Sequence, residues 1–283
     1  MKDPKVIGID LGATNIRGAV VQRQTLSDIM SVRIHSDGEA EDVLNDIYLV
    51  IDRLLTPDIS AIGIGVPSVV DVAEGIVYDV QYIPAWKEVP LKRLLETRYD
   101  KPVYVNNDAN CFALGEYYFG KGRDAASMVG LTIGTGLGGG IIIHDKLFAG
   151  YNCGAGEFGL LPYKDNILEY YCSGSFFNNV HHLDGLHVYE KAKKGDPEAL
   201  QLYAELGDHV GNAIKAVIYT YDPQLIVLGG SVSQSYEWFR ETMWAAVRTL
   251  AYSKTAERIR IEISELQNSG ILGAAALYYD AQQ

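Results

Sequence analysis

Two glycine-rich segments stand out as residues that can handle phosphate. The first spans residues 8–18 and contains Asp10, Gly12 and Thr14, and the second spans residues 133–140. Glycine and a short hydroxyl side chain let backbone N–H groups approach a phosphate more closely than larger side chains allow. Two such turns in one chain predict the binding of a nucleoside triphosphate and the transfer of a phosphoryl group.

The first turn also carries charged residues. Asp10 ends a predicted strand, and we expect its carboxylate to hold Mg²⁺ through water. Arg17 is expected to face the phosphates. Taken alone, the turn could equally be a tight hairpin that Asp10 caps. The second segment favours phosphate binding and supplies the further predicted contacts Gly134, Thr135, Gly136 and Gly138.

A third turn lies near the C-terminal end of the chain. Gly229 and Gly230 follow a buried apolar run and precede a predicted helix. They suit an adenosine pocket, although a plain strand-to-helix connection explains them nearly as well.

Asp108 follows a buried strand and begins a predicted helix, next to Asn107. One interpretation makes Asp108 the N-cap of that helix. The other makes it a general base, which takes the proton of a sugar hydroxyl as the oxygen attacks a γ-phosphate. The two roles are compatible.

Two glutamates are candidate sugar ligands. Glu157 stands among glycines, which is costly unless the backbone must bend sharply, and it can accept hydrogen bonds from neighbouring hydroxyls. Glu169 is a second such acceptor or a solvated surface side chain. His181, His182 and His187 lack a cysteine or carboxylate cluster at ligand spacing, so no metal is expected there.

Composition limits the class of protein. The 283 residues are 48% hydrophobic and 21% charged, which is typical of a soluble globular chain with two lobes. A net charge of −12 argues against nucleic acid as a partner. Three cysteines without CxxC spacing fit a reducing compartment, and Cys111 is expected to pack as a small buried residue. With no predicted signal peptide or membrane span, we expect a cytoplasmic protein with no membrane partner.

Apolar periodicity predicts an α/β fold. Strands are expected at residues 5–9, 18–22, 61–67, 102–105, 128–133, 140–144 and 225–228, and helices at 41–55, 109–120, 197–219, 236–250 and 271–280. The predicted hairpin at residues 128–144 echoes the one at 5–22. The chain therefore reads as two related halves with the active site between lobes.

These motifs together resemble the ROK family of bacterial sugar kinases, within the actin-like, hexokinase-like ATPase superfamily. The ordered series consists of residues 10–14, 63–67, 107–116, 134–140, 156–159 and 229–230. The resemblance implies a two-lobed, actin-like (ribonuclease H-like) α/β fold with an interlobe active-site cleft. We expect an N-terminal lobe of residues 1–117 plus 270–283 and a C-terminal lobe of residues 118–269.

The same resemblance implies the roles of individual residues. Asp108 would be the catalytic base, and Gly65, Asn107, Glu157 and Glu169 would contact the sugar. The donor would be ATP with Mg²⁺, the acceptor usually the 6-hydroxyl, and the protein a homodimer.

The chain departs from the family pattern in three places. Leu160 stands where the family usually has a histidine that binds sugar and zinc. The segment 162–168 is short and contains no cysteine, so no structural zinc is expected. Ser68 stands where glycine is common.

The leading hypothesis is therefore an ATP-dependent hexose kinase of glucokinase type in carbohydrate metabolism. The sugar stays open among glucose, an N-acetylhexosamine, fructose, mannose and allose. The alternatives are a sugar-responsive regulator, a catalytically inactive sensor, and another phosphotransferase or ATPase of the superfamily. A DNA-binding domain ahead of Asp10 is not expected, because Asp10 lies so close to the start.

Overall fold

The computed structural model describes residues 3–80 and 82–283, and the chain divides into two compact units. The first comprises Met1–Asp124, Gly140–Ala155 and Glu265–Gln283, and the second Ala125–Gly139 and Gly156–Ser264. The lobe boundaries expected after residues 117 and 269 stay a prediction.

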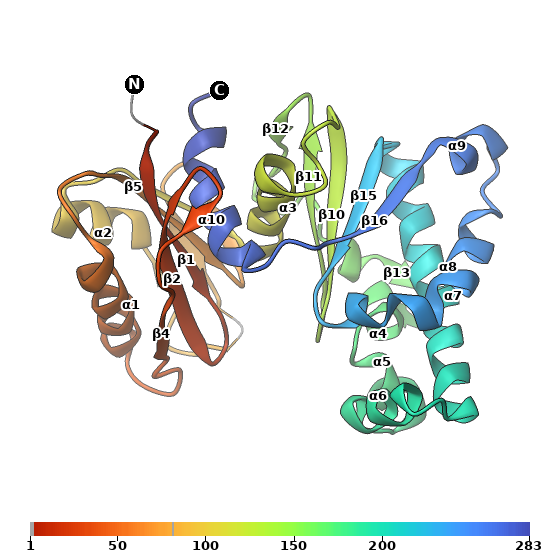
Figure 1. Cartoon of the computed structure of the whole chain (residues 1–283). Coiled ribbons are helices and arrows are strands. Elements are labelled where there is room, and N and C mark those ends of the chain that lie inside the picture. Colours follow the sequence, from red (N-terminus) through yellow and green to blue (C-terminus); the bar gives the residue numbers. More distant parts are fainter. Residues whose placement is uncertain (1–2, 81) are drawn as a thin grey trace. The chain divides into compact units, whose positions relative to one another are not determined.

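The first unit is built on a six-stranded sheet (Figure 1). Strands β1, β5 and β9 are parallel, and β2 pairs antiparallel with β1. The sheet consists of β1 (Lys5–Leu11), β2 (Asn15–Gln22), β3 (Thr25–Leu26), β4 (Met30–Arg33), β5 (Ile59–Val66) and β9 (Val103–Asn107). The four strands expected here are confirmed, and β1 and β2 extend far enough to reduce the first glycine-rich turn to residues 12–14.

Helices cover both faces of this sheet (Figure 1). On one face lie α1 (Ala40–Leu54) and α2 (Leu91–Tyr99), and on the other α3 (Asp108–Phe119) and α10 (Ser269–Asp280). Strand side chains alternate between the faces. Ile7 and Ile9 therefore belong to the core with α1, whereas Val6 packs with α10.

Glycines let α10 approach the sheet at backbone distance. A Cβ added at Gly8 would overlap the carbonyl oxygen of Ile271, and one at Gly63 would overlap that of Ala274. Gly273 of α10 meets the carbonyl of Cys111 on α3 in the same way. These glycines are thus required by close approach rather than by a special backbone angle.

The second large sheet has the order β12-β11-β10-β15-β16. Its strands are β10 (Ser127–Ile133), β11 (Leu137–Ile143), β12 (Lys146–Leu147), β15 (Leu225–Gly229) and β16 (Arg260–Ile263). As in the first sheet, a hairpin strand is followed by three parallel strands. This shared strand order agrees with the similarity between the two predicted hairpins.

Two long helices accompany the second sheet, and smaller elements complete the chain. Helix α7 (Pro197–Tyr221) packs on α8 (Tyr236–Val247), because Gly207 and Gly211 leave room for the α8 backbone. The remaining elements are α4 (Leu168–Cys172), α5 (Phe176–His181), α6 (Gly185–Lys193), α9 (Ser253–Arg258), β6 (Val69–Asp71), β7 (Ile76–Tyr78), β8 (Glu88–Val89), β13 (Pro162–Tyr163), β14 (Asn166–Ile167) and the 3₁₀ turns η1 (Phe158–Leu160) and η2 (Val232–Ser235).

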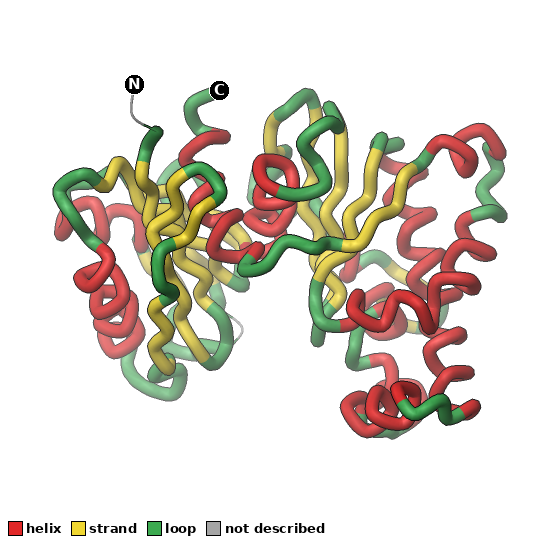
Figure 2. Tube along the Cα trace, in the orientation of Figure 1, coloured by secondary structure: helices red, strands yellow, loops and turns green. Residues whose placement is uncertain are grey.

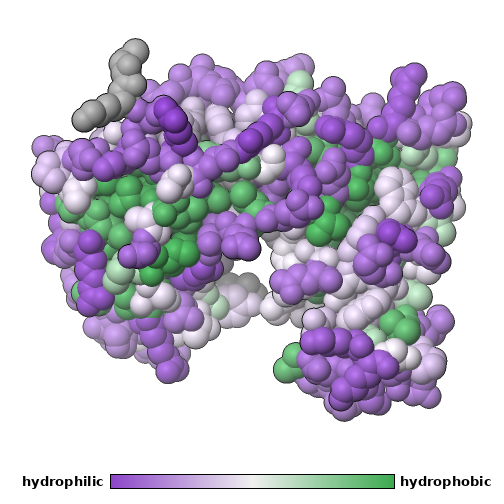
Figure 3. All heavy atoms as spheres, in the orientation of Figure 1, coloured by the Kyte–Doolittle hydropathy of each residue, from purple (hydrophilic) through white to green (hydrophobic). Residues whose placement is uncertain are grey.

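The five predicted helices are all present, within a few residues at their ends. Figure 2 shows how strands and helices are distributed along the chain, and the face drawn in Figure 3 is mainly hydrophilic with hydrophobic patches over both parts. Among residues 3–80 and 82–283, no helix combines the length and apolar character of a membrane span.

Replacing Gly63 by alanine should destabilise the first unit. The new methyl group would strike the Ala274 carbonyl, and overpacking of this kind costs about 1–3 kcal/mol. The matched control is Gly154→Ala, since a Cβ at Gly154 meets nothing within 4 Å. Thermal melting of both variants checks this, and equal melting temperatures would contradict the packing described.

Candidate functional site

Four residues form a row across the carboxyl end of the first sheet. Register pairs Arg17 with Asp10, Asp10 with Gly65, and Gly65 with Asn106. Residues in register share one face, here the face that α10 covers. The row brings together the predicted site residues Asp10, Arg17 and Gly65, and the next two residues after Asn106 are Asn107 and Asp108.

Asp10 is a partly buried carboxylate beside the start of α10. A Cβ at Gly270 would lie 2.7 Å from its Cγ, so the glycine makes room for the carboxylate. Burial raises the pKa of Asp10, and the opposing charge of Arg17 lowers it to a smaller extent. The Arg17 guanidinium also donates to Asn268 Oδ1, so it is held at α10.

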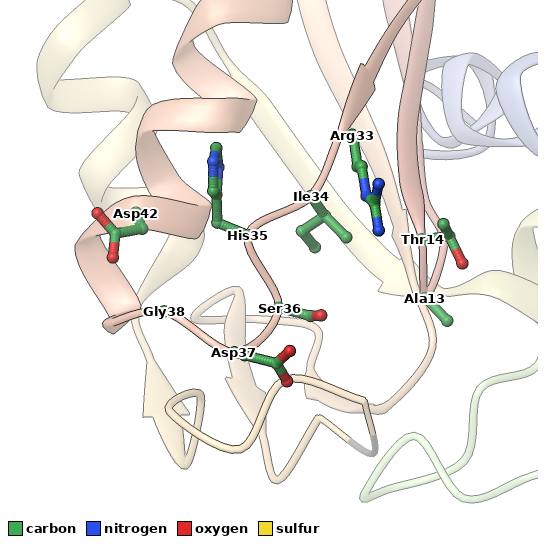
Figure 4. Close-up of a pocket in the computed structure, with 9 residues that line it drawn as sticks. All are labelled: Ala13, Thr14, Arg33, Ile34, His35, Ser36, Asp37, Gly38 and Asp42. Atoms are coloured by element: carbon green, nitrogen blue, oxygen red, sulfur yellow. The ribbon is translucent and has the colours of Figure 1, made fainter.

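The first glycine-rich turn is short and exposed. Gly12 N–H donates to the Asn15 carbonyl at 3.0 Å, while Thr14 is exposed. A cavity of about 500 Å³ adjoins the turn, lined by Ala13, Thr14, Arg33, Ile34, His35, Ser36, Asp37, Gly38 and Asp42. In Figure 4 Arg33 lies on the Thr14 side, whereas His35 points away toward α1. There Nδ1 of His35 lies 2.9 Å from Asp46.

The N-cap of α3 is Asn107 and not Asp108, which corrects one of the two interpretations of Asp108. Oδ1 of Asn107 accepts from the N–H groups of Ala109 and Asn110 at 2.9 and 3.3 Å. Nδ2 of Asn107 donates to the Ser68 carbonyl at 3.2 Å. Asp108 is the first helical residue, and its side chain is exposed. The Ala109 N–H also donates to Oδ1 of Asp108 at 2.8 Å, so the Asp108 carboxylate adds to a helix start that Asn107 already caps.

Small and buried residues fix the backbone beneath Asp108. A Cβ at Gly65 would lie 3.1 Å from Sγ of Cys111 and 3.7 Å from Cα of Asp108. Cys111 is fully buried, as expected from the sequence. Asn106 accepts from Nδ2 of Asn110 at 2.9 Å, and Oδ1 of Asn110 has no hydrogen-bond partner in the described part of the chain.

In the second unit, two glycine-rich turns meet at the carboxyl end of the sheet. Gly229 is in register with Thr132, which lies two residues before Gly134. Gly230 has φ +85° and lies against the Ile133 backbone, where any side chain would clash. Gly134 N–H donates to the Gly136 carbonyl at 3.0 Å. The predicted phosphate turn and the predicted adenosine turn are therefore neighbours.

A cavity of about 440 Å³ opens beside these turns. It is lined by Gly134, Thr135, Gly174, Ser175, Phe177, Gly185, Leu186, Tyr189, Tyr203, Ser231, Val232, Gln234 and Ser235. Gly174 N–H donates to the Gly134 carbonyl at 2.7 Å, and Ser175 Oγ to that of Thr135 at 2.8 Å. Gly134 and Thr135 were predicted from the sequence, whereas Ser175, Tyr189 and Tyr203 were not. The Ser173-Gly174-Ser175 triplet was the only signal for Ser175, and the tyrosines had none.

Glu157 and Glu169 lie close to the same turn. Oε2 of Glu169 accepts from the Leu137 N–H at 2.9 Å, and glycine at 136 leaves room for this carboxylate. Glu157 precedes η1 and is exposed. Although Glu157 is exposed as a residue, partial burial of its carboxylate, followed by the charge of Glu169, raises its pKa. Glu169 thus braces the glycine-rich turn in addition to any contact with a ligand.

The three departures from the family pattern have clear places in the structure. Leu160 is 60% exposed at the end of η1, and residues 162–167 form the short hairpin β13–β14. Ser68 donates to the Tyr78 carbonyl. All three cysteines are buried, and no group of three or more metal-ligating side chains occurs in residues 3–80 and 82–283.

Comparison with known proteins agrees with this architecture. A family model described as ROK family matches residues 6–281. The chain is 28% identical to a glucokinase of Thermotoga maritima, with 96% of both sequences covered. It is 25% identical to a putative xylose repressor of a Caldicellulosiruptor species, covering 96% of this chain and 77% of the repressor.

A solved structure gives the same result. The ROK family glucokinase from Streptomyces griseus in complex with glucose and AMPPNP is 29% identical, with a TM-score of 0.81. The match covers 96% of this chain and 98% of that one. The predicted fold class, that of ROK sugar kinases and actin-like ATPases, is confirmed.

The assignment of the N-cap can be tested through stability. Asn107→Ala should cost about 0.5–2 kcal/mol, because two helix N–H groups lose their acceptor. Asp108→Asn should cost less than about 1 kcal/mol, since an amide oxygen can still accept from the Ala109 N–H and the main loss is the favourable charge at the helix N-terminus. Urea denaturation of both variants decides, and an Asp108→Asn cost as large as that of Asn107→Ala would overturn the assignment.

Proposed function

Because the chain belongs to the ROK family, we propose that it is an ATP-dependent kinase that phosphorylates a hexose, with Asp108 as general base. One observation carries the proposal. Asn107 caps α3, and the exposed Asp108 carboxylate stands at the carboxyl end of a parallel sheet, the usual place for a ligand in α/β folds.

The nucleotide would bind in the second unit. The cavity beside Gly134 and Ser231 has the size of a small-molecule site, and tyrosine rings form part of its wall. We assign the adenosine to this cavity, next to Gly229 and Gly230. We assign the phosphates to the glycine-rich turn with Gly134, Thr135, Gly136 and Gly138, where backbone N–H groups can approach them.

The first unit would contribute the first glycine-rich turn and the carboxylate that holds the metal. Gly12 and Thr14 are placed to contact phosphate, and Arg17 adds positive charge to that end of the sheet. Asp10 is one carboxylate with a glycine at its side, which fits Mg²⁺, a metal that keeps several waters and binds one or two carboxylates plus substrate phosphates. Bound Mg²⁺ would neutralise charge on the transferred group.

The sugar would be held by three polar side chains, with a glycine leaving room for it. Glu157 and Glu169 would accept hydrogen bonds from its hydroxyls, Asn107 would donate to it, and Gly65 would leave room beside Asp108. Asp108 then accepts the proton of the attacking hydroxyl as its oxygen bonds to the γ-phosphorus and the bond to ADP breaks. The acceptor is proposed to be the primary 6-hydroxyl.

Leu160 should influence which sugar the site accepts. This exposed side chain lies three residues after Glu157 in a 3₁₀ turn, where residues at this spacing eclipse. A hydroxyl that a histidine would bind therefore meets an apolar group here. Glucose, N-acetylhexosamines, fructose, mannose and allose should all be assayed by coupled ADP release.

A regulator is the second candidate, because the matched relatives include a putative xylose repressor. Sugar binding without ATP turnover would favour that role. Asp10, Asp108 and both glycine-rich turns favour the kinase. We further propose a cytoplasmic homodimer with no nucleic-acid or membrane partner, in keeping with the net charge of −12.

Asp108→Asn should lower turnover by roughly 10²–10⁴-fold while sugar binding stays near normal, because the amide cannot accept the hydroxyl proton. Steady-state kinetics and calorimetric sugar binding measure the two effects. Asp124→Asn, an exposed carboxylate of the same unit, is the matched control. Turnover within a few-fold of the parent would remove Asp108 from the reaction.

Gly134→Ala should impair nucleotide binding without affecting the fold. A Cβ at this position meets nothing within 4 Å, so the chain itself accommodates it. The methyl group would occupy space assigned to phosphate, and we expect KM for ATP to rise about tenfold or more, equivalent to ~1.4 kcal/mol. Gly154→Ala, which also has open space around its Cβ, is the control. An unchanged KM for ATP would contradict the assignment.

A further inference from the structure

The second unit contains a buried histidine that the proposed reaction does not use. His209 lies within α7 and is 2% exposed. The rings of Tyr163, Tyr171 and Phe176 surround it, with centroids 5.7, 5.2 and 5.6 Å from that of the imidazole. Together with Lys164, these residues are called the His209 cluster below.

The hydrogen bonds of the cluster define the protonation of the ring. Nζ of Lys164 lies 3.4 Å from Nε2 of His209, and the Tyr163 hydroxyl lies 3.1 Å from Nδ1. An ammonium group only donates, so Nε2 is the acceptor and the ring proton belongs on Nδ1. Nδ1 then donates to the Tyr163 hydroxyl. This arrangement requires a neutral imidazole.

Lys164 reaches the cluster from a strained backbone position. It has φ +54° in the two-residue turn between β13 and β14, a conformation that a residue with a side chain seldom adopts. From this position its ammonium contacts His209 and also lies 5.0 Å from the Tyr171 ring centroid. The next residue, Asp165, accepts from the Tyr171 hydroxyl. Contacts to the cluster thus hold the hairpin turn in an otherwise unfavourable geometry.

The cluster is connected to the second glycine-rich turn through α4. This helix has five residues, too few to be stable by itself, and it contains both Tyr171 and Glu169. Tyr171 packs on His209, while Oε2 of Glu169 accepts from the Leu137 N–H at 2.9 Å. A displacement of α4 from α7 would therefore withdraw Glu169 from the turn.

We propose that His209 is a positioning residue: it holds the β13–β14 hairpin and α4 on α7, and thereby keeps the Glu169 carboxylate on the glycine-rich turn. The consequence for nucleotide binding rests on the proposed function. The contact between Glu169 and Leu137 does not rest on the proposed function. The positioning role of His209 and the nucleotide-binding role of the turn can therefore be tested separately.

Protonation of His209 should loosen this arrangement. Burial, followed by the charge of Lys164, lowers the pKa of His209 below its ordinary value of 6.5, against the opposite effects of Asp208 and Glu205. The charged and titratable groups that face the ring are Lys164 and Tyr163 from the hairpin, Tyr171 from α4, His181 from α5, and Glu205 and Asp208 from α7 itself. A lowered pKa means that the unfolded chain binds the proton more readily. The stabilising contribution is therefore complete above about pH 6.5 and decreases as the pH falls below it.

Amide hydrogen exchange of residues 133–140 in the unliganded protein tests the proposal directly. Tyr163→Phe leaves the buried Nδ1–H without its acceptor, so the Leu137 amide should exchange about three- to tenfold faster. His209→Asn keeps a neutral donor and should preserve most of the protection. The matched control is Tyr99→Phe, which removes a hydroxyl that donates to Asp52 at 2.8 Å in the first unit. Unchanged Leu137 protection in a folded Tyr163→Phe protein would overturn the proposal.

A second measurement compares the unmodified protein with His209→Asn, and it remains decisive if Tyr163→Phe fails to fold. Affinity for AMPPNP, measured by calorimetry, should fall more steeply at pH values below 6.5, where His209 of the folded protein takes up its proton, and His209→Asn should flatten this part of the fall. A fall of equal size in both proteins would assign it to other groups and overturn the role of His209. Absence of AMPPNP binding at every pH would count against the proposed function alone, and the exchange experiment would still decide on His209.

Discussion

The backbone contact between α10 and the first sheet is the constraint on which the first unit depends. Gly8 and Gly63 admit the carbonyl groups of α10 where any Cβ would stand. Close approach of the helix also brings Gly270 against Asp10, so the same packing that buries the sheet defines the surroundings of the carboxylate. Because parallel register then places Gly65 beside Asp10 and Asn106 beside Gly65, the position of α3 follows from the sheet.

In the second unit, a carboxylate fixes the position of the glycine-rich turn, a role that a packed helix has in the first unit. A glycine-rich turn has no side chains to hold it, and here Glu169 binds its Leu137 N–H, while Gly230 packs on Ile133 from the other direction. As a result, the position of this turn depends on Glu169, and the position of Glu169 depends on a five-residue helix. Its support comes from aromatic rings and His209 on α7, far along the chain.

Much of this could be predicted from sequence where the signal is local. Buried apolar runs identified the main strands, and helical periodicity identified α1, α7 and α8. Helix α2 was missed because its buried side chains are only Leu91 and Leu95. One interpretation assigned the capping role of Asn107 to Asp108. Both residue types are good N-caps, and the sequence does not fix the start of the helix to within one residue. The His209 cluster joins residues 46 positions apart, and no spacing rule reveals such a contact.

The division of labour between Asn107 and Asp108 has an evolutionary consequence. Since the amide at 107 accepts from two helix N–H groups, the start of α3 keeps a cap when the neighbouring carboxylate changes. Under the proposed function, a single codon change at 108 would remove the general base and leave the groups assigned to the sugar in place. On that proposal, a lineage with this architecture would have a short mutational path between a metabolic catalyst and a nutrient-sensing protein.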